Sequence, residues 1–463
     1  MWFHSLAFAA FLPVVLAGYW VIRQSRLRLA WLLLASYVFY GWWDWRFLGL
    51  IVLSSAVDYW VGRQIAATEE PRQRRRWLSL SLASNLGILG LFKYLGFFVE
   101  SLRSSLAIAG IAIEGPAWNI LLPVGISFYT FQTLSYTLDI YRGQLQPTRD
   151  PLAFFAFVAF FPQLVAGPIE RAQRLLPQFL ASRSFDRGQA VRGLRLMLYG
   201  FFKKLVIADG LARWVDPLFE QAEAVPGLWL WLAALGFSLQ IYADFSAYSD
   251  IAVGVARLFG FELMTNFRAP YGARSLRAFW SRWHISLSTW FRDYVYIPLG
   301  GNRRRHERNL LITFVLSGLW HGANWTFVLW GAVHGTAYVL EQRWRSLGRL
   351  GTLLVVLLAW VLFRAESLSQ ALEVYAGMAG MGIGWLGSPP ATLVLPSQAE
   401  GIYLLASLGL FLLLEQLRYR PVLRDSWAHL SRPWRWASYY ALGGWILLFA
   451  AYEAPQQFIY FQF

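Results

Sequence analysis

A histidine lies near the middle of a long apolar stretch of this sequence. Residues 309–341 read NLLITFVLSGLWHGANWTFVLWGAVHGTAYVLE, and His321 is the histidine near the centre. In a helix, the step from Asn309 to His321 rises about 18 Å, which reaches the middle part of a hydrocarbon slab about 30 Å thick. Ionisable groups at that depth are costly and generally serve a function at a wet, buried site. We therefore expect His321 to act as an acid or base, the alternative being a neutral histidine bonded to a helix carbonyl.

Two glycines and a second histidine add to this candidate site. Gly318 and Gly322 flank His321, where their missing side chains would let a substrate approach the backbone. His284 stands 37 residues before His321, and each histidine follows a tryptophan. On its own, His284 is better explained by packing against Trp280. The two histidines lack a metal-ligand spacing and a nearby carboxylate, so we predict no metal site.

Other polar residues in apolar surroundings favour structural uses. His334 is expected to pack between helices. Asp244 and Asp250 are six residues apart, so they face different sides of a helix and form no paired-carboxylate site. Asp244 and Tyr248 share a face, which predicts contacts across a helix bundle. The sequence also lacks the G-x-S-x-G pattern of serine acyl-enzymes.

The composition is that of a membrane protein. Of 463 residues, 57% are hydrophobic and 14% are charged, whereas soluble domains carry about 25% charged residues. The net charge of +15 comes from short basic clusters between apolar runs, which is typical of loops facing anionic membrane lipid rather than of a nucleic-acid surface. The absence of cysteine excludes disulfides, thiolate metal sites and a cysteine nucleophile.

Apolar runs that predict membrane spans recur along the chain, at 6–22, 29–43, 47–62, 78–98, 119–140, 227–243, 245–261, 309–340, 351–364, 402–417 and 437–453. Arginines follow the first and third runs, and the positive-inside rule places both clusters in the cytoplasm. The N-terminus is then outside, and the first run is expected to be a retained span rather than a signal peptide. No hydrophilic stretch predicts a separate extracytoplasmic domain, so we expect one membrane domain over residues 1–463.

The run 152–169 breaks this alternation, because arginines stand on both of its sides. Pro162 and Pro168 would interrupt a helix within it. A re-entrant, broken segment explains both observations, and a proline-kinked span with one misplaced loop explains them equally well.

The segment 264–308 is too basic to cross a bilayer, yet it is rich in tryptophan. It predicts an amphipathic helix at the cytoplasmic interface or dipping into the protein, with an apolar stripe at Trp280, His284, Leu287, Phe291 and Tyr294. Arg303, Arg304 and Arg305 then form a basic turn, either a solvated loop or a contact for nucleotide phosphates. Farther along, residues 377–398 are expected to be a long loop near the outer surface.

Two histidine motifs resemble those of the membrane-bound O-acyltransferase family. They read FRAPYGARSLRAFWSRWHISLSTWFRDYVYIPLGGNR (267–303) and LSGLWHGANWTFVLWGAVHG (316–335). Further matches are LLPVGISFYTFQTLSYTLDIYRG (121–143), FPQLVAGPIER (161–171), DFSAYSDIAVG (244–254) and FIYFQF (458–463). The resemblance covers nearly the whole chain and is strongest to the bacterial branch that contains the membrane subunit of alginate O-acetyltransferase. Ala247 departs from the glycine of DFSGYSD in that branch and affects local packing only.

Residue by residue, the resemblance assigns the essential histidine to His321. The second catalytic position, which is Asn in other branches, falls on His284, and Asp293 and Asn302 are expected to support the pair. The implied fold is an all-α polytopic membrane protein of roughly eleven transmembrane helices. Re-entrant and amphipathic helices would surround a central funnel, with His321 at its narrowest point.

The resemblance also implies a reaction. Acetyl-CoA in the cytoplasm would donate an acetyl group that crosses the bacterial inner membrane to an extracytoplasmic polysaccharide, such as alginate, cellulose or peptidoglycan. A separate periplasmic acetyltransferase would complete delivery, and no cofactor would stay bound. His321 would deprotonate the acceptor hydroxyl, and basic loop residues would hold the coenzyme phosphates. His284 would position His321 or polarise the carbonyl.

Two other functions compete with this one. A transporter or channel with a proton-relay histidine also suits interrupted helices and ionisable groups at mid-membrane, but its inverted repeats are not evident. Transfer of D-alanine to teichoic acid from a carrier protein belongs to the same superfamily. The segments YIPLGGNR (296–303) and FIYFQF favour the acetyl-transferring branch.

Overall fold

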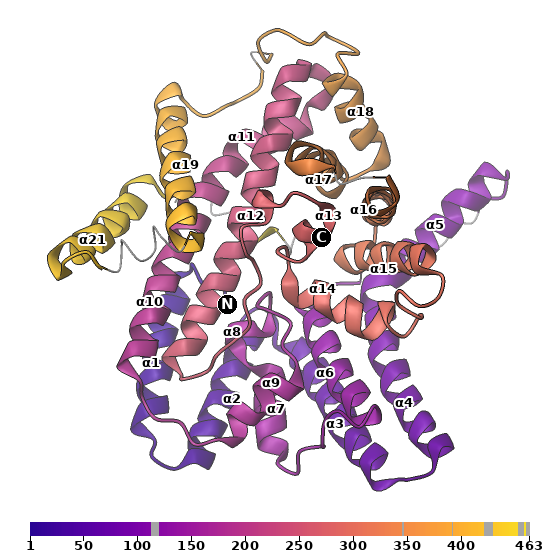
Figure 1. Cartoon of the computed structure of the whole chain (residues 1–463), viewed down its shortest axis with the longest axis vertical. Helices are drawn as coiled ribbons and strands as arrows, with labels where there is room; N and C mark the ends of the chain where they lie inside the picture. Colours follow the sequence, from indigo (N-terminus) through magenta and orange to yellow (C-terminus); the bar gives the residue numbers. More distant parts are fainter. Residues whose placement is uncertain (113–119, 345–346, 391, 421–428, 452–457, 460–463) are drawn as a thin grey trace. The chain divides into compact units, whose positions relative to one another are not determined.

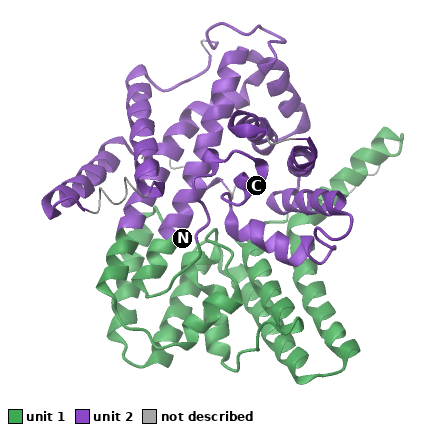
Figure 2. Ribbon diagram, in the orientation of Figure 1, with its two compact units in different colours: residues 1–194, 252–264 green, residues 195–251, 265–463 purple. Residues whose placement is uncertain are grey.

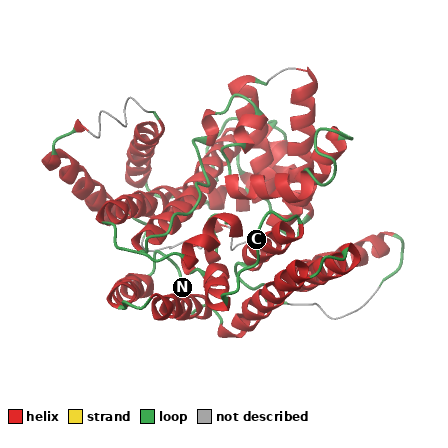
Figure 3. Cartoon of the chain, turned by 60° about the horizontal axis from the view of Figure 1, so that its bottom comes forward, coloured by secondary structure: helices red, strands yellow, loops and turns green. Residues whose placement is uncertain are grey.

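The computed structural model describes residues 1–112, 120–344, 347–390, 392–420, 429–451 and 458–459. Every regular element in these ranges is a helix (Figure 1, Figure 3), so the all-α prediction is confirmed. Three helical stretches are long and apolar enough to cross a membrane, Pro71–Ile108, Gly227–Leu258 and Gln398–Tyr419. Parts of four predicted segments lie outside the described residues, namely 119, 391, 452–453 and 460–463.

The chain divides into two compact units, which Figure 2 shows in different colours. Unit 1 comprises Met1–Leu194 and Ala252–Met264, and unit 2 comprises Arg195–Ile251 and Thr265–Phe463. Two helices, α10 (Arg187–Phe202) and α12 (Gly227–Leu258), contribute residues to both units.

Unit 1 is a set of packed helices held by apolar contacts and a few buried polar ones. Its remaining elements are α1 (Leu6–Val21), α2 (Ser25–Gly41), η1 (Trp45–Phe47), α3 (Leu48–Ala67), α4 (Pro71–Leu89), η2 (Gly90–Tyr94), α5 (Leu95–Ile108), α6 (Ile126–Tyr141), α7 (Pro151–Ala159), α8 (Phe161–Leu164) and α9 (Ala172–Leu180). Between α3 and α4, the buried carboxylate of Asp58 accepts hydrogen bonds from Ser81 and from Asn85, at 2.5 and 2.8 Å. These bonds give the buried Asp58 carboxylate the hydrogen-bond partners that apolar side chains cannot supply.

The predicted interruption of the run 152–169 is present. The Asp150 carboxylate caps α7, and the helix ends before Phe160, whose backbone leaves the helical region. The freed carbonyl of Phe157 accepts bonds from the Gln132 and Gln163 side chains, at 2.9 and 3.0 Å. Because these residues are buried and the two side chains replace the lost helix bond of the Phe157 carbonyl, the broken backbone is tolerated inside protein.

Unit 2 contains the helices that carry the candidate site. Besides its shares of α10 and α12, they are η3 (Lys203–Ala208), α11 (Asp209–Glu220), η4 (Ala222–Ala224), η5 (Pro270–Gly272), α13 (Leu276–Trp280), α14 (Ile285–Phe291), η6 (Arg292–Tyr296), α15 (His306–His321), α16 (Trp325–Trp344), α17 (Gly348–Arg364), α18 (Leu368–Met378), α19 (Gln398–Tyr419) and α21 (Arg432–Phe449). Between α18 and α19, the described residues form the predicted loop.

Two predictions of helix number in unit 2 are wrong. The runs 227–243 and 245–261 were expected as two spans, but α12 passes through Asp244 without a break. Asp244 is tolerated there because Lys204 pairs with its carboxylate at 2.9 Å. Conversely, the run 309–340 contains two helices, because Asn324 accepts a bond from the Thr326 N–H and starts α16 anew.

Candidate functional site

Glycines allow α15 and α16 to lie in direct backbone contact. A Cβ atom added at Gly318 would stand 2.1 Å from the carbonyl oxygen of Phe327. At Gly331, an added Cβ would stand 2.3 Å from the carbonyl oxygen of Phe314. Only residues without a side chain permit this approach, as in close helix pairs of membranes generally.

The expectation that Gly318 and Gly322 leave room for a substrate is therefore wrong. The space beside Gly318 holds the α16 backbone, and the space beside Gly322 holds the Phe327 ring, 2.1 Å from an added Cβ. Both glycines position α16 and its aromatic side chains around His321.

His321 is the last residue of α15, where the helix gives way to the extended Gly322. Its ring is 4% exposed and meets the rings of Trp330 and Phe363 edge-on, with centroids 5.1 and 5.3 Å away. The preceding residue, Trp320, contributes a third aromatic contact at 5.0 Å. The predicted helix leading to His321 is thus present, and the imidazole is oriented by an aromatic enclosure.

His284 lies at a break in the predicted amphipathic helix. α13 ends at Trp280 and α14 begins at Ile285, so the apolar stripe from Trp280 to Tyr294 is not one continuous helical face. Between them, His284 adopts a left-handed backbone with φ 43° and ψ 54°. That conformation is uncommon for a residue other than glycine and costs about 1–2 kcal/mol.

Asn266 holds this strained turn in place. Its carbonyl oxygen accepts from the Ile285 N–H at 2.9 Å, and its side-chain oxygen accepts from the N–H and the hydroxyl of Ser286, at 3.2 and 2.9 Å. These bonds satisfy donors at the start of α14. Asn266 is buried and immediately precedes the first histidine motif, and no pattern in the sequence had singled it out.

The turn brings the second histidine to the first. The ring centroids of His284 and His321 lie 6.2 Å apart, and the rings of Phe245 and His284 form a T-shaped pair with centroids 4.5 Å apart. Burial lowers the pKa of His284 well below its usual range. His284 is therefore neutral at physiological pH.

Phe458 and Ile459, near the C-terminus, pack against α12 next to Phe245. The ring of Phe458 lies 5.7 Å from that of Phe245 and 4.8 Å from that of Tyr248. The Ile459 N–H donates to the Asp244 carboxylate at 2.7 Å. Phe458 and Ile459 thus contact α12 beside the Phe245 ring that packs on His284, and Asp244 has the structural use expected of it.

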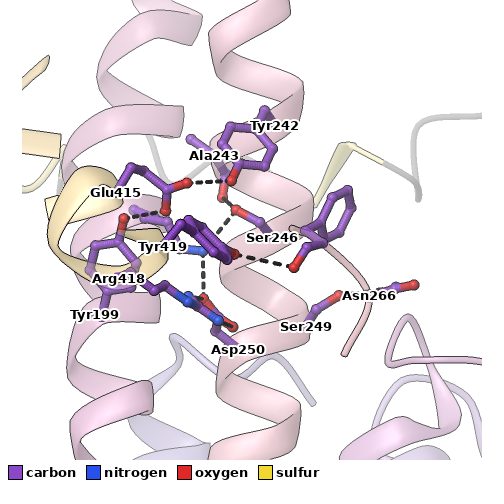
Figure 4. A network of polar contacts seen from close by, with 12 residues as sticks. Tyr199, Tyr242, Ala243, Ser246, Ser249, Asp250, Asn266, Glu415, Arg418 and Tyr419 are labelled. Atoms are coloured by element: carbon purple, nitrogen blue, oxygen red, sulfur yellow. Dashed lines mark hydrogen bonds and ion pairs between the residues drawn. The ribbon is translucent and has the colours of Figure 1, made fainter. Parts of the chain in front are cut away.

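A buried charge network joins α10, η3, α12 and α19 (Figure 4). Lys203 binds the Asp250 carboxylate at 2.6 Å, and Arg418 binds the other oxygen of that carboxylate at 2.8 Å. Glu415 accepts from the Tyr199 and Tyr242 hydroxyls at 2.6 and 2.5 Å. Sequence reasoning missed these partners. The sequence signal for them was the presence of charged residues within apolar runs. A buried charge needs a compensating partner, but the sequence does not identify which residue that partner is.

A cavity of about 730 Å³ opens between α13, α14, η6, α15 and α16. Its exposed end is polar and basic, with Arg277, Arg292 and Asn302. Its buried end includes Ser317, which lies one turn, about 6 Å, before His321 on α15. The ring of Trp280 also lines the cavity and packs on Trp330, which contacts His321. His321 itself is not among the residues that line this cavity.

A cluster of polar side chains stands at the cavity's exposed end. The Tyr296 hydroxyl bonds the Asn302 side chain and the His306 ring nitrogen Nδ1. The other His306 nitrogen lies 2.6 Å from the Gln342 side-chain oxygen. Asn302 thus lies at the exposed end of the cavity, away from His284 and His321.

The remaining predicted site residues lie in η6 and on the exposed turn that follows Asn302. Asp293 pairs with Arg292 at 2.7 Å. Arg303, Arg304 and Arg305 are exposed and follow Asn302, outside the cavity lining. The described residues contain no group of three His, Asp or Glu side chains placed to hold a metal ion.

Comparisons with known proteins agree with these motifs. The family model of the membrane-bound O-acyltransferases matches residues 145–357. A probable alginate O-acetylase of Azotobacter vinelandii is 44% identical over 385 residues, 80% of this chain and 76% of the relative. The corresponding Pseudomonas aeruginosa protein is 44% identical over 80% of this chain and 73% of its own length. A peptidoglycan O-acetyltransferase of Helicobacter pylori is 36% identical over 80% of this chain and 78% of its own length.

Proposed function

Because the chain belongs to the membrane-bound O-acyltransferase family, we propose that it moves acetyl groups from cytoplasmic acetyl-CoA to an extracytoplasmic polysaccharide. The pairing of the His284 and His321 rings, with the cavity of unit 2 reaching Ser317 one turn before His321, carries this proposal. The chain is a membrane-bound O-acyltransferase, and the donor, the acceptor and the inner-membrane location are the proposed parts. In the proposed fold, roughly eleven spans surround a funnel that narrows at His321.

The cavity of unit 2 suits a coenzyme thioester. Its volume of about 730 Å³ falls within the range of about 300–1,000 Å³ typical of small-molecule sites. Arg277 and Arg292 at its exposed end offer guanidinium groups to the coenzyme phosphates, and Arg303 to Arg305 add charge beyond Asn302. The acetyl end then points toward Ser317 and His321. The aromatic pair Trp280 and Trp330 stands between the cavity and His321, so the final approach requires Trp280 to move.

His321 acts as the general base of the proposed reaction. Its imidazole accepts the proton of the acceptor hydroxyl, and the oxygen attacks the thioester carbonyl to form a tetrahedral intermediate. Collapse of the intermediate breaks the carbon–sulfur bond, and His321 returns the proton to the leaving thiolate. The neutral ring of His284 keeps His321 oriented or donates a hydrogen bond to the carbonyl oxygen.

The proposed acceptor is a polysaccharide hydroxyl. The relatives are named for O-acetylation of alginate and of peptidoglycan, two polymers outside the cytoplasm. An alginate-type exopolysaccharide is the acceptor we favour, with a periplasmic partner protein that completes delivery.

Labelled acetyl-CoA tests the proposal directly. Purified full-length protein is given acetyl-labelled coenzyme and oligosaccharide acceptors, and the transferred label is compared between wild type and His321→Ala. Loss of the general base is expected to lower the rate about 10²–10⁴-fold. The exposed His429→Gln variant is the control and should keep full activity. Equal transfer by His321→Ala would remove the catalytic role, and transfer of D-alanine from a carrier protein instead would redirect the donor.

A further inference from the structure

A second cavity, within unit 1, is rich in arginine. It encloses about 570 Å³ where α1 ends, α2 begins, α7 begins and α9 ends. Four arginines line it, Arg26, Arg28, Arg149 and Arg183. Against them stands one lining carboxylate, that of Asp150, so the cavity has a formal charge of +3. The proposed acyl transfer uses no residue of this cavity.

Two of the arginines are held rigidly by neutral groups. The Arg28 guanidinium donates to the Ile22 carbonyl at 3.0 and 2.8 Å and to the Arg183 carbonyl at 2.8 Å. The Arg183 guanidinium donates to the Gln178 carbonyl at 2.9 and 2.6 Å and to the Gly260 carbonyl at 3.0 Å. Carbonyl oxygens orient these cations without cancelling their charge. The cavity is therefore electropositive and preorganised for an anion.

The other charged groups of the cavity are one carboxylate with a structural bond and two exposed arginines. The Asp150 carboxylate accepts from the Ala153 N–H at 3.2 Å as the cap of α7. Arg26 and Arg149 are exposed, so their side chains are free to turn onto a bound ligand. Two fixed and two adjustable guanidinium groups match an anion with several oxygens, above all a phosphate, which arginine binds in bidentate fashion.

The surroundings of the cavity are those of a lipid headgroup. Exposed apolar side chains lie beside it, with Val21 78%, Leu27 57% and Leu180 53% exposed. Trp20 next to it donates its indole N–H to the Leu258 carbonyl at 3.0 Å, and tryptophan favours the membrane–water boundary. The positive-inside rule places this end of α1 at the cytoplasmic leaflet, where anionic lipids gather.

We propose that this cavity binds the phosphate headgroup of an anionic phospholipid from the cytoplasmic leaflet. The phosphate lies between Arg28 and Arg183, and Arg26 and Arg149 close over it. The acyl chains extend along the exposed apolar side chains at Val21 and Leu180. Such a lipid bridges the α1–α2 turn and the segment after α9, so its binding raises the thermal stability of the protein.

Native mass spectrometry of the full-length protein in detergent tests the site. The probes are dioleoyl phosphatidylglycerol, zwitterionic dioleoyl phosphatidylcholine and soluble glycerol 3-phosphate. The double variant Arg26→Gln, Arg149→Gln removes the two exposed cations and keeps the bonds of Arg28 and Arg183. Its control is Arg75→Gln, Arg76→Gln, an equal loss of charge at exposed positions of α4 in the same unit.

The wild type and the control are expected to bind phosphatidylglycerol in preference to phosphatidylcholine. The cavity variant is expected to bind phosphatidylglycerol about thirtyfold more weakly, from about 1 kcal/mol for each lost arginine. It should also lose the rise in unfolding temperature that phosphatidylglycerol produces in the wild type. Equal weakening in the control variant would overturn the site. Binding of a soluble phosphate compound with no preference for phosphatidylglycerol would overturn the lipid as its source.

Discussion

The rings of His284 and His321 lie 6.2 Å apart, and each belongs to the end of a helix. His284 precedes the first residue of α14, and His321 is the last residue of α15. A side chain at a helix end is less constrained by neighbouring turns than one inside the helix. The pair therefore depends on how two helices end, and the backbone at those ends determines the site as much as the imidazoles do.

Substitutions at His284 are expected to separate its backbone role from its side-chain role. Asparagine tolerates the left-handed region, whereas a β-branched residue does not. The free energy of unfolding of His284→Asn should therefore lie within about 1 kcal/mol of the wild-type value. That of His284→Val should be lower by about 2 kcal/mol or more. Thermal unfolding of the purified variants measures both.

Comparable stability of the asparagine and valine variants would show that the left-handed turn is not under strain. Acetyl transfer by His284→Asn then reports the side chain alone. We expect it to fall while the fold is kept, because the smaller asparagine side chain does not replace the imidazole ring beside His321.

Asn266 is expected to control the position of His284 without touching a substrate. Asn266→Ala removes the acceptor of the Ser286 N–H and hydroxyl, and loss of such a cap costs about 1–2 kcal/mol. Asn266→Asp keeps an oxygen in that place and serves as the matched variant. We expect the turnover number of the alanine variant to fall and that of the aspartate variant to stay closer to wild type. Equal loss in both variants would mean that the side-chain oxygen does not hold the turn.

Helical periodicity and composition predicted much of the fold. The all-helical architecture, the break in residues 152–169 and the loop between α18 and α19 follow from apolar runs, prolines and glycines, which act locally. The break at Phe160 comes directly before α8, in which Pro162 is the second residue, and proline is tolerated in the first turn of a helix but not inside a continuous one. Patterns of this kind need no knowledge of distant partners.

The features of the fold that the sequence did not predict depend on contacts between segments far apart in the chain. α12 remains one helix because Lys204 compensates the buried Asp244, a partner that no local pattern identifies. The helix predicted over the apolar stripe breaks at His284 because Asn266 caps α14 from an earlier segment. Gly318 and Gly322 were expected to admit a substrate, but only packing with α16 shows what occupies the space beside them.

Gly318→Ala is expected to disrupt the contact between α15 and α16. The new Cβ would stand 2.1 Å from the Phe327 carbonyl oxygen, which belongs to backbone and has little freedom to move. Overpacking of this kind costs about 1–3 kcal/mol, and the shift of α15 should also lower acetyl transfer. Gly409→Ala is the control, because nothing lies within 4 Å of its added Cβ in α19. Thermal unfolding should show a loss for the first variant and none, or a small gain, for the second.

The pKa of His284 predicts a dependence of stability on pH. Burial holds this pKa far below about 6.5 in the folded protein, while the unfolded chain titrates near that value. Below about pH 6.5 the unfolded state binds a proton at this residue and the folded state does not. The free energy of unfolding therefore falls by up to about 1.4 kcal/mol per pH unit as the pH decreases. His284→Asn removes this contribution. Its deficit relative to wild type should shrink as pH falls from about 7.5 to 5, and a constant deficit would contradict the assigned burial.

Filling the inner end of the unit 2 cavity is expected to weaken donor binding. Ser317 lines the cavity and is 8% exposed, one turn before His321. In Ser317→Phe the new ring occupies the place assigned to the acetyl thioester, so KM for acetyl-CoA should rise about tenfold or more, equivalent to about 1.4 kcal/mol. Leu316→Phe adds a ring at the neighbouring residue, which is 41% exposed, and should leave KM unchanged. An unchanged KM in the Ser317 variant, with an intact unfolding temperature, would place the donor elsewhere than in this cavity.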